Sequence, residues 1–497
     1  MNFPARAFSL LAGLLSLSSE TLWVRTYSFV QESTPPAVSF VLAVFLVAIA
    51  LGAAAGAWLC KRGTRLPEAA IISMMIAAII IVLSPALLSL RPYSRWVAAL
   101  LMFAPAFFHS ICFPICHEHG TNRESGKVGR SLSTVYAANI VGSTLGPLLV
   151  NFGLLEFATT QLAFAVLGTI GLAISAFFAL RRSPPRLLRI AAYASFVLAA
   201  LCIAMTAGPD NWLMSKLSRA PYDIRRIIET RQGIVTAYTI DEGGDVIYGG
   251  NVYDGRANVD ARVNSNGINR VLVLAAARPA PKRVLVIGLS VGSWTYLVSG
   301  FPSIEHMDVV EINPGYYKLI RDYVDNRRIF DDSKIRFHVA DGRHFLRRST
   351  EKYDLMVMNT TWHWRAYSTF LLSKEFLELA RDHLAPDGLI AYNATGSPDV
   401  LKTAKAVFPH AYLYESFVVA AAYDWRKKFT EPGAVEHLLS IAPQGHPVFL
   451  SGDGNLAKNF LSIPTRDVDT VAREITRPLE VITDRNMITE YRFGRHW

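Results

Sequence analysis

Long apolar stretches dominate the first 208 residues of the chain. Seven follow one another, at roughly 6–31, 36–60, 68–90, 96–117, 131–155, 158–180 and 189–207. Most reach the ~20 residues that a helix needs to cross a bilayer core of ~30 Å. The first stretch lacks a small-residue cleavage site, so it is interpreted as a retained helix and not as a secretory signal. Residues 1–208 are therefore predicted to form a multi-pass α-helical domain in the cell membrane.

Short alternating segments replace the long apolar stretches after residue 208. Gly233 to Asp241 and Asp245 to Tyr253 alternate with period two around a Glu-Gly-Gly sequence. This pattern predicts a β-hairpin, and Asp254-Gly255 predicts a second turn. Residues 209–280 are predicted to form a linker and this small β subdomain.

Apolar runs of strand length alternate with helical segments from residue 281 to residue 497. Arg283 to Ile287 is a continuous apolar run, which is typical of a parallel strand buried on both faces. The alternation predicts a doubly wound α/β domain of the Rossmann type. The expected strands are 283–287, 306–311, 334–339, 353–358 and 388–393, and the expected helices are 293–299, 314–326 and 374–384.

Charge separates the two parts of the chain. The formal net charge is +10, and the first 208 residues contribute +8 of it, with 14 Lys and Arg against 6 Glu and no Asp. The second part is nearly neutral, which removes the support for a nucleic-acid partner. The lipid bilayer is instead the expected partner of the first part. A homo-oligomer is also expected.

Three polar features of the membrane part carry separate hypotheses. Glu20 is interpreted as a structural ion-pair partner of Arg25, with a substrate or ion path as the alternative. The spacing of Gly142 and Gly146 predicts close packing of two helices. Four possible metal ligands are interpreted as packing and interfacial residues, so no metal site is predicted; they are Cys112, Cys116, His117 and His119.

The chemistry of the α/β domain is expected at the carboxyl ends of its strands. A Gly-x-x-x-Gly turn follows the first strand, and Gly288, Ser290 and Gly292 of this turn are predicted to let the backbone approach a nucleoside closely. Glu311 ends the next strand, 23 residues after Gly288, where an acid can accept both ribose hydroxyls. Ile312 belongs to the same predicted site.

A third predicted element of the nucleoside site follows the next strand. Asp341 and Gly342 are expected to hold the adenine edge. The alternatives are structural: an Asx turn at Asp341, a region before a helix at Glu311, and tight packing at the glycine turn.

Loop charges predict an orientation for the membrane part. Basic residues follow the second, fourth and sixth apolar stretches, and the positive-inside rule then places the N-terminus in the cytoplasm. Seven crossings would then place the second part of the chain outside the cell. This conflicts with the use of a cytosolic nucleoside, so the side of the membrane on which the second part lies stays open. The basic residues are Lys61, Arg62, Arg65, Arg123, Lys127, Arg130, Arg181, Arg182, Arg186 and Arg189, against Arg91 and Arg95 after the third stretch.

The order of these motifs resembles the spermidine synthase family of polyamine aminopropyltransferases, with its class I methyltransferase-like Rossmann fold. The whole chain is similar to the membrane-embedded, fused transporter and spermidine synthase type. The matching segments are Glu20 to Arg25, Tyr136 to Asn139 with Gly142 and Gly146, Val286 to Gly292, Val309 to Glu311, Asp341 to Arg343, Trp364 to Ala366, Ser373 to Phe376, Leu384 to Gly388, and Thr483 with Asp484.

The resemblance implies a particular ligand. Substrates of this family suggest S-adenosylmethionine or decarboxylated S-adenosylmethionine, with Glu311 on the ribose and Asp341 near the adenine. A membrane-bound, spermidine synthase-like transferase is therefore expected, one that releases methylthioadenosine. The alternative is a transporter or sensor with a non-catalytic nucleoside-binding domain.

The chain departs from the family's pattern where the acceptor binds. The glycine turn lacks the family's Asp, and Asn359 and Trp362 replace two further acids. The acidic segment upstream is replaced by residues 264–269. An amide has no usable basicity, so ordinary putrescine aminopropylation is not expected.

The remaining catalytic hypotheses require no strong base. Sulfonium chemistry can proceed by proximity and desolvation, with attack by a nucleophilic acceptor or by the ligand's own carboxylate. Asn359, His363 and Tyr253 are the predicted catalytic residues. His363 alone among them titrates near neutral pH, and a packing role is its alternative.

Overall fold

The computed structural model describes residues 4–63, 65–90, 94–121, 128–181, 186–208, 211–240, 243–359 and 361–495. The chain divides into two compact units: Met1–Gln31 with Pro36–Arg219, and Glu32–Pro35 with Ala220–Trp497. The domain boundaries expected at residues 208 and 280 stay predictions. Five residues used in the sequence analysis lie outside the described ranges: Arg91, Arg123, Lys127, Arg182 and Asp241.

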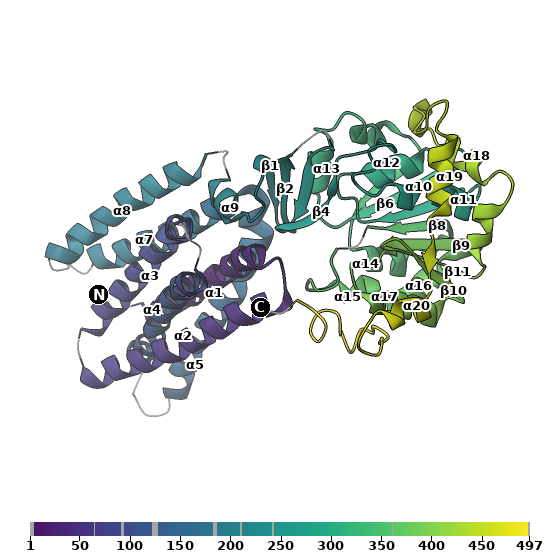
Figure 1. The fold of residues 1–497 in the computed structure, drawn as a ribbon. Coiled ribbons are helices and arrows are strands. Elements are labelled where there is room, and N and C mark those ends of the chain that lie inside the picture. The colour runs from purple at the N-terminus through teal and green to yellow at the C-terminus, as the bar shows by residue number, and fades with distance from the viewer. Residues whose placement is uncertain are drawn as a thin grey trace. The chain divides into compact units, whose positions relative to one another are not determined.

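The first unit is helical (Figure 1). Seven helices within the described ranges are long and apolar enough to cross a membrane, which confirms the predicted apolar helices. No membrane side is determined by them, so the orientation stays a prediction. The helices are α1 (Ala5–Val30), α2 (Pro35–Arg62), α3 (Leu66–Leu88), α4 (Arg95–Gly120), α5 (Val128–Leu149) continued by η1 (Val150–Leu154) and α6 (Leu155–Phe157), α7 (Thr160–Leu180) and α8 (Arg186–Thr206); the short α9 (Trp212–Leu217) follows.

Helix α5 packs closely on α1 through the predicted glycine pair. A Cβ added at Gly142 would lie 1.9 Å from the carbonyl oxygen of Leu10, and one at Gly146 would lie 2.4 Å from that of Leu14. Asn139 strengthens the contact, because its Nδ2 donates to the Ser9 carbonyl at 2.9 Å. The small-residue spacing therefore predicted the helix pair correctly.

The expected ion pair between Glu20 and Arg25 is wrong for the residues described. Arg25 instead donates from Nε to the Thr160 hydroxyl of α7 at 2.9 Å. Residues five apart lie about 140° apart around a helix of 3.6 residues per turn, so the two side chains leave α1 in different directions. The ion-path hypothesis for Glu20 stays a prediction.

Cysteine side chains of α4 pack inside the helical unit. Cys112 and Cys116 are buried, and the Cys112 thiol donates to the Ala70 carbonyl of α3 at 3.4 Å. These contacts agree with the packing interpretation of Cys112 and Cys116.

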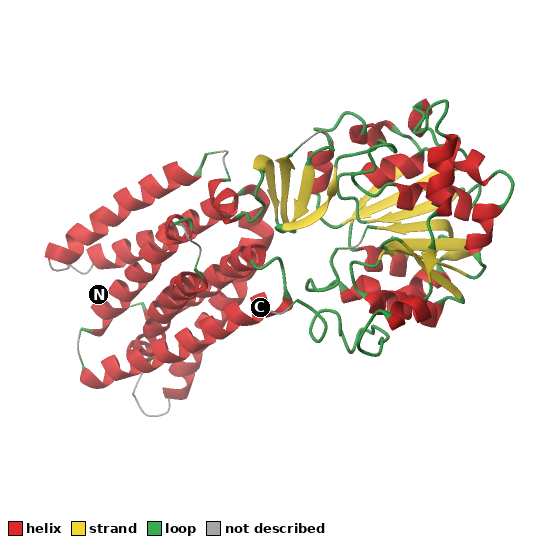
Figure 2. Cartoon of the chain, viewed as in Figure 1, coloured by secondary structure: helices red, strands yellow, loops and turns green. Residues whose placement is uncertain are grey.

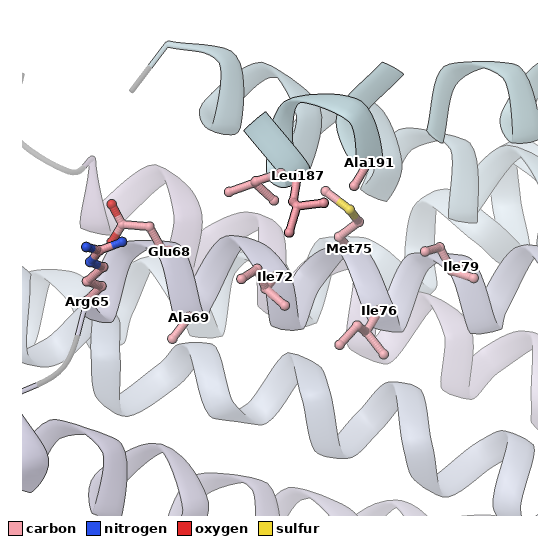
Figure 3. Close-up of a pocket in the computed structure, with 10 residues that line it drawn as sticks. Arg65, Glu68, Ala69, Ile72, Met75, Ile76, Ile79, Leu187 and Ala191 are labelled. Atoms are coloured by element: carbon pink, nitrogen blue, oxygen red, sulfur yellow. The ribbon is translucent and has the colours of Figure 1, made fainter. Parts of the chain in front are cut away.

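A groove of about 780 Å³ runs along α3 and α8 (Figure 3). Its charged residues, Arg65 and Glu68, lie near the start of α3, and the rest of its lining is apolar. The lining residues are Arg65, Glu68, Ala69, Ile72, Met75, Ile76, Ile79, Leu187, Leu188 and Ala191. The groove therefore offers few partners for a polar solute along most of its length.

The second unit begins with a small antiparallel sheet of the order β1-β2-β3-β4. The hairpin of β2 and β3 confirms one prediction, but the second turn lies at Gly250-Asn251 and not at Asp254-Gly255. Gly250 and Asn251 form the turn and have positive φ, whereas Asp254 and Gly255 lie within β4, where Gly255 faces Ile247 and Asp254 is the extra residue of a register shift. The strands are β1 (Asp223–Thr230), which was not predicted, β2 (Gly233–Thr239), β3 (Val246–Gly249) and β4 (Val252–Arg256).

The larger sheet of the described chain has the order β12-β10-β11-β9-β8-β5-β6-β7. Neighbours from β9 to β7 are parallel, and β11, β10 and β12 continue the sheet with antiparallel pairs. This order confirms the doubly wound α/β prediction. The strands are β5 (Arg283–Ile287), β6 (His306–Glu311), β7 (Ile335–Val339), β8 (Tyr353–Met358), β9 (Leu384–Asn393), β10 (His410–Tyr414), β11 (Phe417–Ala421) and β12 (Thr465–Arg466).

Helices cover both faces of this sheet (Figure 2). Strand β5 shows why, because Val284 and Val286 pack into one apolar core and Leu285 and Ile287 into the other. One face is covered by α10 (Asn269–Leu272), α11 (Leu274–Ala277), α12 (Ser293–Ser299), α13 (Gly315–Ile320), α18 (Ala434–Leu439) and α19 (Gly454–Ser462), and the other by α14 (Gly342–Arg348), α15 (Thr369–Leu372), α16 (Lys374–Asp382), α17 (Pro398–Val407) and α20 (Val468–Arg473); the short 3-10 turns are η2 (Asn326–Asp331), η3 (Trp425–Thr430) and η4 (Pro443–Gly445).

The helix expected over residues 314–326 is much shorter, because α13 ends at Ile320. Tertiary contacts explain the difference. The Tyr323 hydroxyl donates to Asp245 at 3.0 Å, and Asn326 Nδ2 donates to the Val291 carbonyl at 2.7 Å. These two anchors require a turn where local sequence favours a helix.

Candidate nucleoside-binding site

The glycine turn after β5 brings the backbone close to the end of β8. Gly288 has a φ of +85°, and a Cβ there would lie 2.4 Å from the carbonyl oxygen of Asn359. Gly292 has a φ of +80° and directly precedes α12. Both positions therefore need glycine, so the turn has the close backbone approach that the sequence predicted.

Glu311 lies at the end of β6 with its carboxylate turned toward this turn. Its side chain accepts hydrogen bonds from the backbone N–H of Leu289 at 2.8 Å and of Asn313 at 2.7 Å. A carboxylate has about four lone-pair sites, so the carboxylate keeps acceptor capacity for a ligand hydroxyl. Glu311 is buried, whereas Ile312 is 55% exposed, so the edge of the strand reaches the surface next to the acid.

Burial raises the pKa of Glu311 to about 7, and the negative charge of Asp254 adds to the rise. The hydrogen bonds from Asn313, Leu289 and the Ile312 backbone oppose it. The carboxylate thus changes charge near neutral pH, which makes any hydroxyl ligand that it holds sensitive to pH.

Asp341 follows β7 and begins α14. Its side chain is the N-cap of that helix and accepts from the His344 N–H at 2.7 Å. Gly342 is needed for packing, because a Cβ there would lie 2.5 Å from Ile287. The cap occupies one carboxylate oxygen of Asp341, and the assignment of the residue to adenine stays a prediction.

Asp254 joins the same region, although its sequence was interpreted as a turn. Its Oδ2 accepts from the Tyr316 hydroxyl at 2.6 Å, and its backbone carbonyl accepts from the Ser290 hydroxyl at 3.1 Å. Burial raises the pKa of Asp254, while hydrogen bonds from Tyr316 and Ser290 and the charge of Arg365 lower it. Asp254 is therefore a second acid beside the glycine turn, and its charge contributes to the raised pKa of Glu311.

Polar side chains of a different kind lie at the ends of β8 and β9. Asn359 Oδ1 accepts from Asn393 Nδ2 at 3.1 Å, and Asn393 Oδ1 accepts from Arg270 at 3.0 Å. Arg270 directly follows residues 264–269, and its guanidinium lies 5.0 Å from the ring centre of Trp294. Arg270 was not predicted from the sequence, because two of its partners, Asn393 and Ser416, lie more than 120 residues away.

Two of the predicted catalytic residues, Tyr253 and His363, have contacts of their own. Trp362 Nε1 donates to the Tyr253 carbonyl at 3.0 Å, so Tyr253 and Trp362 are neighbours. His363 Nδ1 lies 2.6 Å from the Thr395 carbonyl oxygen, and burial lowers its pKa. Hydrogen bonds to the Thr395 and Phe493 backbone oppose that shift. These contacts give His363 a structural function, and its catalytic role stays a prediction.

Three motifs that carried the family resemblance meet in one structural network. Arg343 donates to both oxygens of Asp484, at 2.7 and 2.5 Å, and the Ser373 hydroxyl donates to Asp484 at 2.7 Å. The Asp484 N–H in turn donates to Glu375 at 3.0 Å. Arg343 is buried, and its charge lowers the pKa of Asp484. These residues therefore hold α14, α16 and the C-terminal segment together.

Parts of this chain are similar to known proteins. Residues 271–423 match the spermine/spermidine synthase domain. The polyamine aminopropyltransferase of Agathobacter rectalis is 31% identical over 153 residues, or 30% of this chain and 52% of the relative. Polyamine aminopropyltransferase 2 of Streptomyces coelicolor is 27% identical over 278 residues, or 54% of this chain and 49% of the relative. The chain thus spans about half the length of the curated relatives that it matches.

A solved spermidine synthase in complex with the transition-state analogue AdoDATO aligns at 19% identity with a TM-score of 0.38. The alignment covers 49% of this chain and 89% of that one. The matched segment, residues 271–423, contains strands β5 to β9, the glycine turn and Glu311. Residues 271–423 are therefore similar to the spermine/spermidine synthase domain, and seven long apolar helices precede them in the described residues.

Proposed function

We propose that the α/β unit binds S-adenosylmethionine or its decarboxylated form and acts on it as a transferase. The observation that carries this proposal is the approach of the glycine turn to Glu311. The Leu289 N–H donates to the Glu311 carboxylate at 2.8 Å, so the turn and the acid are held together. A ribose bound there would place its hydroxyls on a buried carboxylate.

The reaction is transfer from a sulfonium. A nucleophile attacks the carbon next to the positively charged sulfur, the carbon–sulfur bond breaks, and its electron pair returns to the sulfur. When the aminopropyl carbon is attacked, the leaving group is methylthioadenosine. Because the leaving group is a neutral thioether, it needs no general acid, and the enzyme supplies orientation and exclusion of water.

Putrescine is not the acceptor that these side chains favour. Asn359 has no basic group to take a proton from an ammonium, and Arg270 lies two hydrogen bonds away. A dication would meet amide and guanidinium donors where it needs carboxylates. An acceptor that is already nucleophilic, or the carboxylate of the ligand itself, fits this surface better.

The helical unit is proposed to place the enzyme at the cell membrane as a multi-pass protein. Seven helices of the described chain have the length and composition for this. The groove along α3 and α8 does not favour the alternative of nucleoside transport, because its lining is apolar over most of its length. No polar partner for ribose or adenine is available along that part of the groove.

Mass spectrometry of the products tests the proposal. The purified full chain is incubated with each nucleoside, with and without polyamines. Release of methylthioadenosine without a polyamine requirement is expected, and S-adenosylhomocysteine would instead indicate methyl transfer. Binding without turnover would support a sensor, and absence of binding to either nucleoside would overturn the proposed site.

A further inference from the structure

Arg270 is a guanidinium held by neutral groups. Its Nε donates to the Gly267 carbonyl at 2.9 Å, and its Nη atoms donate to Asn266, Asn393 and Ser416 at 2.7–3.1 Å. None of the described carboxylates forms an ion pair with it. Glu415, the acid whose charge acts on it most, is exposed. Other arginines of the unit differ: Arg343 pairs with Asp484, and Arg477 pairs with Asp399.

The direction of the hydrogen bonds from Arg270 is fixed. A guanidinium only donates, so the Asn393 atom that it contacts must be the amide oxygen. The Asn393 amide nitrogen then donates to Asn359 Oδ1. The remaining amide group of Asn359 is therefore Nδ2, a donor. This chain of bonds leaves Asn359 Nδ2 as a hydrogen-bond donor at the carboxyl end of β8. The positive charge of Arg270 lies two hydrogen bonds behind it.

The donor on Asn359 and the acid Glu311 lie along the same edge of the larger sheet, where the proposed ligand would bind. Glu311 ends β6, and the strands that follow across the sheet are β5, β8 and β9. Three strand spacings separate Glu311 from Asn393, roughly 14 Å at ~4.8 Å each. A nucleoside with its ribose on Glu311 would direct its sulfonium arm along this edge toward Asn359 and Asn393.

We infer that the Arg270–Asn393–Asn359 chain selects a ligand whose arm carries a carboxylate. The inference rests on the proposed function and narrows it to S-adenosylmethionine in preference to the decarboxylated form. The two nucleosides differ only by that carboxylate, because both carry the sulfonium and the amino group. A carboxylate accepts from Asn359 Nδ2 and is attracted by the Arg270 charge, whereas the decarboxylated arm leaves both without an anionic partner.

Isothermal titration of the full chain with three ligands tests the inference. S-adenosylmethionine and its decarboxylated form differ in the arm, and methylthioadenosine lacks the arm altogether. The wild-type protein is expected to bind S-adenosylmethionine at least about tenfold more tightly than the decarboxylated form. Equal or tighter binding of the decarboxylated form overturns the inference while the proposed nucleoside site stands.

Two substitutions separate the role of the Arg270 charge from its structural role. Arg270→Gln is expected to reduce the preference for S-adenosylmethionine over its decarboxylated form to about twofold or less. Arg270→Lys should keep part of this preference. Arg262→Gln is the matched control in the same segment, where the arginine pairs with Asp453 and is exposed.

Methylthioadenosine affinity reports whether each variant still folds. It should stay within about twofold of the wild-type value in all three. A preference that survives Arg270→Gln with normal methylthioadenosine binding overturns the inference. If Arg270→Gln does not fold, the ratio of the wild-type affinities for S-adenosylmethionine and its decarboxylated form decides the inference. If none of the three ligands binds, the proposed function fails and the inference fails with it.

Discussion

The edge of the larger sheet at which its parallel strands end has two halves of opposite chemistry. The half formed by β6 and β5 carries the buried acid Glu311, with Asp254 beside it. The half formed by β8 and β9 carries two asparagines and the guanidinium of Arg270. Under our proposals, the acid of the first half binds ribose hydroxyls and the donors of the second half bind an anion. The proposed nucleoside site thus keeps the acid that the family resemblance implies, whereas the end proposed to react has lost its acids.

The strongest test of this contrast removes the acid of the first half. Glu311→Ala is expected to weaken adenosyl ligands by about 100-fold or more, because two hydrogen bonds to a charged acceptor are lost. Calorimetric titration measures the change. Glu305→Ala is the matched control, since Glu305 is exposed near the opposite end of β6 and pairs with Lys282. Retained affinity in Glu311→Ala would remove the site assignment.

Binding should also depend on pH through the same acid. The pKa of Glu311 is about 7 and lies above its usual value of 4.5, so the ionised form that accepts the ribose hydroxyls is lost as pH falls through 7. Affinity should drop about tenfold between pH 8 and pH 6, as one protonation with this pKa requires. Titrations at several pH values measure it. A flat profile would contradict an ionised Glu311 in the complex.

The stability of the free protein should change with pH in the direction opposite to that of ligand affinity. A carboxyl whose folded pKa is raised contributes stability that is full below 4.5 and is lost as pH rises through 7. Glu311→Gln removes this titration, so its melting temperature should fall less than that of the wild type between pH 5 and pH 8. Equal changes in melting temperature between pH 5 and pH 8 for the two proteins would contradict the raised pKa of Glu311.

Asp254 provides a finer test, because its charge helps to raise the pKa of Glu311. Asp254→Asn keeps an acceptor for the Tyr316 hydroxyl but removes the charge. The midpoint of the pH profile for binding should move to lower pH, with a severalfold gain in affinity at pH 6. Asp322→Asn removes an acid that instead pairs with Arg226 and should leave the midpoint in place. An unchanged midpoint in Asp254→Asn would show that the two acids act independently.

Local pattern was enough to predict strands β5 to β9 and to propose the residues of the first half of the site, but it did not predict β1, β10, β11 or β12. The run Arg283 to Ile287 and the helix Ser293 to Ser299 have the predicted bounds, because burial on both faces imposes a continuous apolar sequence. Glu311 could be found because it follows a strand at a fixed distance from the glycine turn. Residues Gly142 and Gly146 were found for a similar local reason, their spacing on one helix face.

The places of Asp254 and Arg270 could not be predicted, because they depend on tertiary contacts. Asp254 precedes a glycine, and this pair is a common turn signal. Only its place in β4 shows that the carboxylate meets Tyr316. Arg270 lies 123 residues from Asn393 and 146 from Ser416, so no local spacing reveals their contact. The loss of acids was visible in the sequence, but the cation that replaces them was not.

The smallest expected effect comes from returning one acid to the second half. Asn359→Asp places a carboxylate at the end of β8, where it can accept from Asn393 and be attracted by Arg270. A carboxylate-bearing arm should then bind severalfold more weakly, and putrescine-dependent release of methylthioadenosine should rise by no more than about tenfold. The gain stays small because Trp362 still replaces the second acid and Arg270 still opposes a cation. Product assays with both nucleosides measure it. A large gain would mean that Asn359 alone prevents the ordinary reaction, and that the positive charge of Arg270 has little influence on which ligand is used.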